Sequence, residues 1–591
     1  MFLNSFLFSA GLLIAHTDTL QTVIVTADKG VVVSRTDTTM ISPTQTVVDV
    51  LNNYSSLLLS DYGGLAGNKS VSFRGLGSAH TNIYVDGVKV GNVQSGQTDL
   101  GSLSFNTYSK LAVDYAQNSV YLTTSMPSSQ KKVSGEVAFR GGTWNTYLPY
   151  ARLNVRLSEN VVSSYTAGGI FSKGNYSYGE AGIVRENNDM KQGQFGADFW
   201  GTLQNGTWHT KAYLNTSDRG VAGSTSWPSA DRQNDKNMFL QGSLSNRFNS
   251  LYEFTSSAKL SYDYMRYESS YGENYYKQFE GQINTSHLFH FTKWFTLSAS
   301  LDAFIDNLCS DNYNAFRTNL NTVITAAFRT QRLKANVSVD YLGTFDKDGE
   351  NRNALMPAID LRMKVFNGFD LVAFGRRTYR VPTFNELYYV GFGNPDLKCE
   401  DAWLSDFGVE WNKCLDAWSF QAKADYFYNY LTDKITSALS PDDTNVWAPY
   451  NIGKVQINGF DLSVKTKYQI QSWKMNLGVR YTLQNALDKT IDSYTFDEQI
   501  PYVAKHAFSI NLDASYKDWN ISGVFNHRSG RKDSMGSMPA WNTLDITASK
   551  TFVSKYMIFV KTTNLTNTKY EISTGYPMPG ISVQGGFNLR F

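Results

Sequence analysis

From Val133 to its C-terminus the chain divides into segments of about 9 to 15 residues in which apolar and polar side chains alternate. Residues 581–591 show this best, because every odd position is apolar or glycine and every even position is polar or glycine. Successive residues of a strand point to opposite faces, so the pattern predicts strands whose two faces meet different surroundings. A soluble β-sandwich alternates in the same way, so the pattern alone leaves open whether the apolar faces meet a protein core or lipid.

The connections between these segments alternate between short and long. The short connections contain Asn205-Gly206, Asn249-Ser250, Asn367-Gly368 and Lys517-Asp518, and an Asn-Gly pair favours a two-residue hairpin turn. The long connections cover residues 175–190, 217–236, 381–401, 436–452, 485–505, 529–540 and 564–580. Short turns at one rim and long loops at the other are typical of an outer-membrane β-barrel, and a sandwich gives no reason for them.

We therefore predict an all-β membrane protein, in which residues 133–591 form an antiparallel transmembrane barrel of about 22 strands in the bacterial outer membrane. Aromatic residues make up 14% of the chain, a share that suits the aromatic girdles of such a barrel. The lumen of a barrel of this size must be filled, or it would leak. Residues 28–132 lack the alternation and are rich in glycine, so we expect them to form a plug in the lumen.

The N-terminus does not indicate a helical membrane protein, because no segment offers the roughly 20 consecutive apolar residues that a spanning helix needs. Residues 1–17 are interpreted as a signal peptide of atypical form, since they contain an apolar run but neither a basic start nor an A-x-A cleavage site. The formal net charge of +2 argues against a nucleic-acid partner.

A segment that precedes the plug, residues 18–27, resembles the TonB box of the TonB-dependent outer-membrane receptors. Its uncharged, β-branched run suits strand addition to the sheet edge of a partner protein, although the same run also fits a first strand of the plug. The resemblance assigns TonB binding to Thr22, Val23, Ile24, Val25, Thr26 and Ala27.

Three further stretches carry the same resemblance. Residues 71–90 are similar to the family's plug core, with Arg74 either paired at the boundary between plug and barrel or solvated, and with a turn at Asp86-Gly87. Residues 379–400 resemble a barrel loop of the family, except that Cys399 replaces a proline and places a thiol on a long outer loop. The strand that ends in Phe591 resembles the signal for barrel insertion. The chain departs from the family pattern at residues 116–118 and 131–136, so the final plug strands are expected to pack differently.

The resemblance implies TonB-dependent import of a scarce, large nutrient, and cobalamin is our first choice of cargo. Residues 91–100 resemble the apical plug loop of cobalamin receptors and offer neutral amide and hydroxyl groups, while outer-loop aromatic rings would cover apolar faces of the ligand. The expected substrate-binding residues are Asn92, Gln94, Ser95, Gln97, Thr98, Tyr388, Tyr389 and Phe392. A ferric-siderophore or haem receptor is the alternative cargo class, and a passive channel or a surface binding protein is the alternative from another class. A surface lipoprotein is a further candidate partner, beside TonB and outer-membrane lipid.

Acidic residues in the predicted outer loops raise the question of a bound metal. Some cobalamin receptors bind calcium through such loops, and Asp218, Asp231 and Asp235 share one of them here, so we consider calcium at this place, with no other cofactor. His287 and His290 lie three positions apart on a predicted strand and therefore face opposite sides. No hydrolase, nucleotide-binding or zinc-protease motif occurs, so we do not expect an enzyme.

Overall fold

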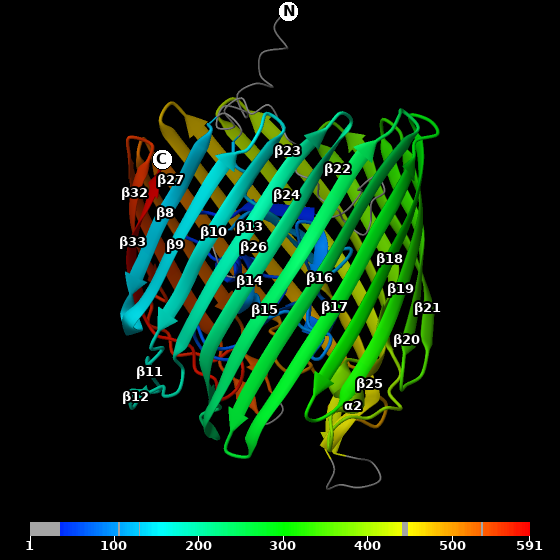
Figure 1. The fold of residues 1–591 in the computed structure, drawn as a ribbon, viewed down its shortest axis with the longest axis vertical. Helices are drawn as coiled ribbons and strands as arrows, with labels where there is room; N and C mark the ends of the chain where they lie inside the picture. Colours follow the sequence, from blue (N-terminus) through cyan, green and yellow to red (C-terminus); the bar gives the residue numbers. More distant parts are fainter. Residues whose placement is uncertain (1–35, 104–106, 129–130, 440–446, 534–535) are drawn as a thin grey trace, which may run out of the picture.

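The computed structural model describes residues 36–591 with the exception of 104–106, 129–130, 440–446 and 534–535. A closed barrel of 22 antiparallel strands surrounds a small domain formed by the N-terminal part of the chain (Figure 1). The predicted fold class is thereby confirmed. None of the helices in the described residues is long and apolar enough to cross a membrane.

The barrel begins at Val133, and its last strand, β33, pairs with its first, β8, to close it. Its strands are β8 (Val133–Gly142), β9 (Thr146–Arg156), β10 (Val161–Ser172), β13 (Met190–Leu203), β14 (Gly206–Gly223), β15 (Pro228–Arg247), β16 (Tyr252–Ser269), β17 (Gly272–Phe289), β18 (Phe295–Ser310), β19 (Asn314–Arg329), β20 (Leu333–Asp346), β21 (Arg352–Phe366), β22 (Phe369–Arg380), β23 (Glu400–Leu415), β24 (Trp418–Leu439), β25 (Trp447–Ile470), β26 (Trp473–Asp488), β27 (His506–Tyr516), β28 (Trp519–Arg528), β31 (Trp541–Phe552), β32 (Tyr556–Thr563) and β33 (Ser582–Arg590).

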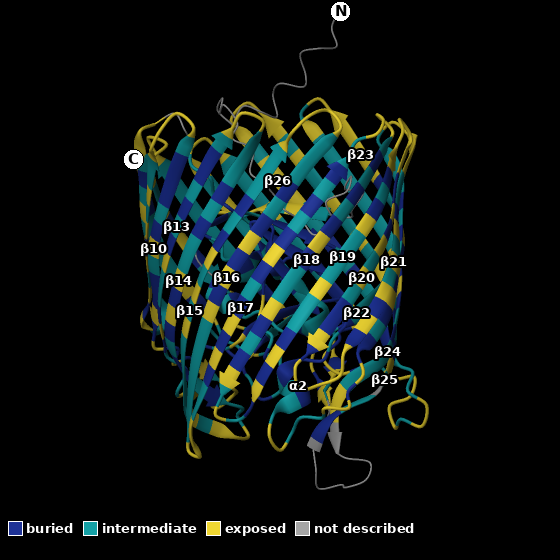
Figure 2. Cartoon of the chain, turned by 45° about the vertical axis from the view of Figure 1, so that its right-hand side comes forward, coloured by how far each residue is buried: buried dark blue, intermediate teal, exposed yellow. Residues whose placement is uncertain are grey.

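The distribution of apolar and polar side chains in the barrel is the reverse of that in a soluble protein. On β18 the side chain of Leu301 is 45% exposed, whereas its neighbours Ser300 and Asp302 are 4% and 3% exposed. The same alternation of exposed and buried residues runs along the outer wall in Figure 2. Because the apolar side chains point outward and the polar ones inward, the outer face suits lipid and the lumen is polar.

The two rims differ in the way the sequence predicts. Asn367-Gly368 joins β21 to β22 and Lys517-Asp518 joins β27 to β28, and both turns lie at the rim where the C-terminus ends (Figure 1). The opposite rim carries the long loops. These contain β11 (Ser177–Tyr178), β12 (Ile183–Val184), α2 (Phe384–Tyr388), β29 (Arg531–Lys532) and β30 (Ser537–Met538), whereas η3 (Thr143–Asn145) forms the short connection from β8 to β9.

Two of the predicted long loops are wrong in extent. Strand β14 continues to Gly223 and β15 starts at Pro228, so most of residues 217–236 is strand, and β24 and β25 likewise extend through much of 436–452. Beyond the membrane a strand has no lipid face, so polar residues occupy both sides and the alternation that marks a strand is lost.

The plug has its own sheet and its own apolar core. Its elements are β1 (Thr36–Met40), α1 (Val47–Leu51), β2 (Leu57–Asp61), β3 (Lys69–Phe73), η1 (Ser78–His80), β4 (Asn82–Val85), β5 (Val88–Val90), η2 (Leu100–Leu103), β6 (Tyr108–Asp114) and β7 (Ser119–Thr124). Strands pair in the order β1-β6-β7-β4-β5, and β2 pairs with β3. The buried core includes Tyr54, Phe73 and Leu122, and all its members belong to the plug.

The turn predicted at Asp86-Gly87 joins β4 to β5. Both residues have positive φ, 51° and 83°, and the flanking residues Val85 and Val88 pair directly. Two positive φ values in a two-residue hairpin are the geometry that an Asp-Gly pair tolerates best.

Cys399 lies on the long loop between α2 and β23, as the sequence predicts, but its thiol is buried against Tyr379. Cys309 and Cys414 are exposed, and all three cysteines are free thiols.

Candidate functional site

Arg74 lies at the boundary between the plug and the barrel. One of its terminal nitrogens, Nη1, is 3.0 Å from the carboxylate of Asp406 on β23, and the other, Nη2, is 2.5 Å from that of Asp461 on β25. The guanidinium also lies 4.0 Å from the ring centroid of Phe427. A buried cation with two carboxylates and a ring face is well compensated, so Arg74 anchors the plug to the wall.

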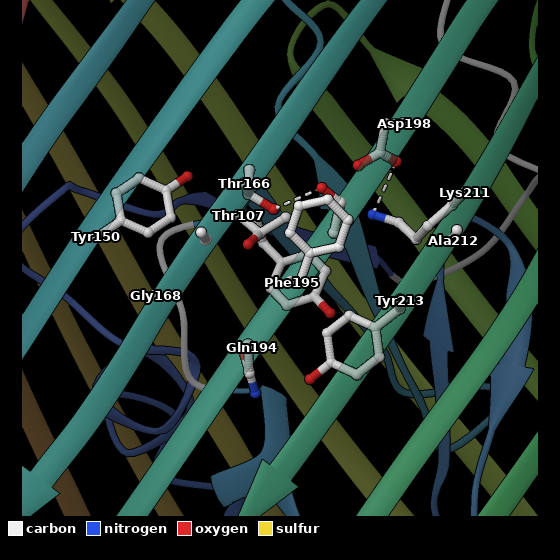
Figure 3. A pocket seen from close by; sticks show the side chains of 13 residues that line it. Thr107, Tyr150, Thr166, Gly168, Gln194, Phe195, Asp198, Lys211, Ala212 and Tyr213 are labelled. Carbon is white, nitrogen blue, oxygen red and sulfur yellow. Dashed lines mark hydrogen bonds and ion pairs between the residues drawn. The ribbon is translucent and has the colours of Figure 1, made fainter.

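Asp86 makes a second anchor on another side of the plug. Its carboxylate accepts hydrogen bonds from the backbone and hydroxyl of Thr124, and Lys211 on β14 lies 3.2 Å away. Figure 3 shows Lys211 reaching Asp198 on the neighbouring strand, a distance of 3.0 Å. Burial alone would raise the pKa of Asp86, but Lys211 and His209 hold it below its usual value.

A metal is not needed to explain this cluster. Among the described residues, Asp86, Asp198 and His209 form the one group of three side chains that could share an ion. The ammonium of Lys211 already lies between the two carboxylates, and the imidazole of His209 is 2.8 Å from Asp198. The protein therefore supplies its own cation at this place.

Two further acidic residues of the plug pair with bases of the barrel wall. Asp37 lies 3.1 Å from Arg480 and also contacts Lys465, and Asp49 lies 2.7 Å from Lys561. Burial would raise the pKa of both carboxyls, yet the neighbouring cations lower it. Ion pairs thus connect the plug to the barrel wall on several sides.

One outer loop folds inward onto the apex of the plug. The backbone N–H groups of Phe384 and Asn385 donate to the carbonyls of Val93 and Gln94, at 3.2 and 3.0 Å. Helix α2 begins in this contact, and its capping box pairs Thr383 with Glu386. The plug apex and the loop after β22 therefore form one surface.

The predicted substrate-binding residues of the plug lie at different places on this surface. Asn92 and Thr98 line a cavity of about 420 Å³ between the plug and strands β17 to β22. Gln94 is buried, while Ser95 is exposed and donates its backbone N–H to Asn92. Gln97 is half-buried.

The predicted aromatic residues lie in the inward-folded loop. Tyr388 and Tyr389 pack against Tyr313, with ring centroids 6.3 Å away in both cases. Phe392 is half-buried and donates its backbone N–H to Tyr389. The structure thus brings the loop aromatics close to the plug apex, but none of the three lines the 420 Å³ cavity.

A second cavity, which the sequence did not indicate, lies on the outer side of the plug. It measures about 350 Å³ and is enclosed by β2, β3 and the loops around Tyr502, Arg531 and Tyr576. Single basic residues in long polar loops carry no periodic signal, so nothing in the sequence groups them.

The three acidic residues considered for calcium lie on β14 and β15. Asp218 is 2.6 Å from Arg232, Asp235 is 3.6 Å from Arg219, and Asp231 accepts a hydrogen bond from Tyr267. An ion would have to take these carboxylates from their present partners. The predicted TonB box, residues 18–27, lies outside the described residues.

Comparisons with known proteins agree with this architecture. A family model described as "TonB dependent receptor-like, beta-barrel" matches residues 128–565, and one described as "TonB-dependent Receptor Plug Domain" matches residues 25–126. A curated relative, the vitamin B12 transporter BtuB of Vibrio vulnificus (strain YJ016), is 23% identical over 89% of this chain and 86% of its own length.

Solved structures with other cargo share the fold. The FrpB iron transporter from Neisseria meningitidis superposes with a TM-score of 0.78 at 12% identity, covering 94% of this chain and 99% of its own. The copper transporter OprC gives 0.78 at 13% identity with the same coverage. The unliganded ferric citrate transporter FecA gives 0.76 at 12% identity, covering 95% and 97%.

Proposed function

Because the chain belongs to the family of TonB-dependent outer-membrane receptors, we propose that it actively imports cobalamin across the outer membrane. The observation that carries the choice of cargo is the plug apex, where the neutral residues Asn92 and Thr98 line a large cavity whose barrel side also carries charged residues. Neutral donors and acceptors suit the amide groups on the rim of a corrin. The vitamin B12 transporter relative, which aligns over most of both chains, supports the same cargo.

The plug makes an energised importer a better proposal than a passive channel. Ion pairs at Asp37, Asp49, Arg74 and Asp86 connect it to the barrel wall around its circumference. Movement of the plug requires work, and we propose that TonB supplies it by pairing with residues 22–27. The family is one of transporters and receptors, and we propose no enzymatic activity.

The test of cargo is calorimetric binding of cyanocobalamin to the full chain in a non-ionic detergent, with ferric citrate and haem as parallel ligands. We expect saturable binding of cyanocobalamin that the double variant Asn92→Ala/Gln97→Ala weakens. The matched control is Asn160→Ala, an exposed asparagine in the turn between β9 and β10. Binding of an iron complex instead of cyanocobalamin would contradict the choice of cargo and would remain compatible with the import function.

An iron complex is the second candidate cargo, because the FrpB and FecA structures share the fold across nearly the whole chain. A surface binding protein that does not transport is distinguished by an uptake assay, in which it would bind the ligand without importing it.

Two predicted additions remain proposals. Calcium at Asp218, Asp231 and Asp235 would appear as saturable calcium binding that Asp231→Asn abolishes. A surface lipoprotein would appear as a protein that copurifies with the barrel and depends on its outer loops.

A further inference from the structure

Most cations inside the barrel have a carboxylate partner. Arg74, Lys211, Arg317, Arg352 and Arg380 each lie within 3.3 Å of at least one. The 350 Å³ cavity on the outer side of the plug is different. Lys434, Arg528 and Arg531 line it, no acidic residue does, and none of the three forms a direct ion pair with another described residue. Lys434 is half-buried and feels Glu400 and Asp488 from farther away, as Arg531 feels Glu571. A buried cation without a direct counter-ion is costly, so the two buried arginines need an explanation.

Arg531 is the most informative of the three. It is 8% exposed, and its Nη2 donates to the backbone carbonyls of Glu571 and Ile572 at 2.5 and 3.2 Å. These bonds hold the guanidinium in place, while Nη1 is buried and has no hydrogen-bond partner among the described residues. Burial lowers the pKa of Arg531, since Tyr502 and Glu571 offset only part of the lost hydration. The guanidinium is thus fixed in the cavity wall with one donor unpaired among the described residues.

The other two cations converge on the same space. Arg528 is buried and lies 5.9 Å from the ring centroid of Trp541. Within the described part of the chain, its guanidinium donates only to the backbone carbonyls of His527 and Tyr54. Lys434 follows an irregularity in the pairing of β24 with β25. Such irregularities redirect side chains, and Lys434 lines the cavity from the barrel wall.

The remaining walls are apolar or aromatic. Leu58 and Leu59 of the plug face Ile500 and Val503 of the outer loops, and Trp541 and Tyr576 add rings. A ligand that fits must therefore combine an anionic group with an apolar or aromatic body.

We propose that this cavity is an anion subsite, in which Arg531, Arg528 and Lys434 bind a phosphate or carboxylate carried on an apolar or aromatic body. Its role as a subsite for part of the imported molecule rests on the proposed import function, whereas the anion binding does not. Cyanocobalamin carries one phosphodiester, so cobalamin itself is a candidate source of the anion.

The experiment uses the full chain in a non-ionic detergent with phenyl phosphate and benzoate as anionic probes and benzamide as the neutral probe. Calorimetry is expected to show saturable binding of at least one anion and about tenfold weaker binding of benzamide. Preference for phenyl phosphate over benzoate, or the reverse, identifies the anion chemistry. Equal binding of all three probes, or binding of none, would overturn the proposal.

Variants distinguish the loss of a positive charge from a disruption of the loops that enclose the cavity. Arg531→Gln and Lys434→Gln are each expected to weaken anion binding about tenfold. Lys434→Gln is the safer variant, because the side chain of Lys434 forms no hydrogen bond or ion pair with another described residue, and its backbone pairing with Gly453 is unaffected. The control is Lys532→Gln, the adjacent cation, which is exposed and paired with Glu498 at 2.7 Å. Unchanged anion binding in both test variants would overturn the proposal.

Competition between cyanocobalamin and phenyl phosphate separates the anion-site proposal from the cobalamin proposal. If cyanocobalamin displaces phenyl phosphate, the anion site is supported together with the cobalamin proposal. If the anion binds and Lys434→Gln weakens it, but cyanocobalamin neither binds nor displaces it, the anion site is supported and cobalamin is rejected.

Discussion

The guanidinium of Arg74 and the carboxylate of Asp406 lie 3.0 Å apart although 332 positions separate them in the chain. One belongs to the plug and the other to β23 of the barrel, and both are buried. Asp461 completes the contact from β25. The plug is therefore docked by specific charges, and its attachment can be tested one residue at a time.

Replacement of Arg74 tests the anchor directly. Arg74→Met leaves the buried carboxylate of Asp406 and the partly buried one of Asp461 without their cation, so we expect a loss of about 3 to 5 kcal/mol in the free energy of unfolding. Urea denaturation in detergent measures it. Arg247→Met, an exposed arginine at the end of β15, is the control and should change stability by less than about 0.5 kcal/mol. Equal stability of the two variants would contradict an anchoring role.

The anchor at Asp86 predicts a pH dependence. Because the folded pKa of Asp86 is lowered, its contribution is present above the unfolded value near 3.8 and is lost as the pH falls through the folded value. Asp86→Asn keeps the shape of the side chain and removes the charge. We expect the variant to melt below the wild type at pH 7, and the difference to shrink at pH 3. A difference in melting temperature that stays constant with pH would argue against a contribution of the Asp86 charge to stability.

The close contact at Gly96 predicts that the inward-folded loop docks tightly on the plug apex only when this residue has no side chain. Its φ is +68°, and an added Cβ would lie 2.6 Å from Cγ2 of Thr383. Gly96→Ala should therefore loosen the loop from the plug apex by about 1 to 2 kcal/mol, seen as roughly tenfold faster hydrogen exchange in residues 383–393. Gly91→Ala is the control, because its Cβ would meet nothing closer than 3.9 Å. Equal exchange in both variants would show that the loop does not depend on this contact.

Alternation and turn residues were sufficient to predict the barrel. Spanning strands such as β18 and β33 meet lipid on one face and a polar lumen on the other, so their period-two pattern is strong. The Asn367-Gly368 and Lys517-Asp518 turns were located correctly for the same local reason. The outer halves of β14 and β15 were missed, because polar residues occupy both faces there.

The site was harder to predict, because its contacts are not local. The sequence indicated Arg74 as a boundary charge through resemblance, but not that Asp406 and Asp461 would be its partners. Arg531 was missed entirely, since its significance comes from a cavity that six separate parts of the chain enclose. Burial of Cys399 also depends on neighbours that only the folded loop brings together.

The central claim is energised import, and deletion of residues 21–27 tests it most directly. In intact cells, uptake of radiolabelled cyanocobalamin by the deletion variant is compared with uptake by the wild type, and surface binding is measured on the same cells at low temperature. We predict that the deletion abolishes uptake while the receptor remains in the outer membrane and binds its ligand as before. Uptake at the wild-type rate without these residues would contradict the account.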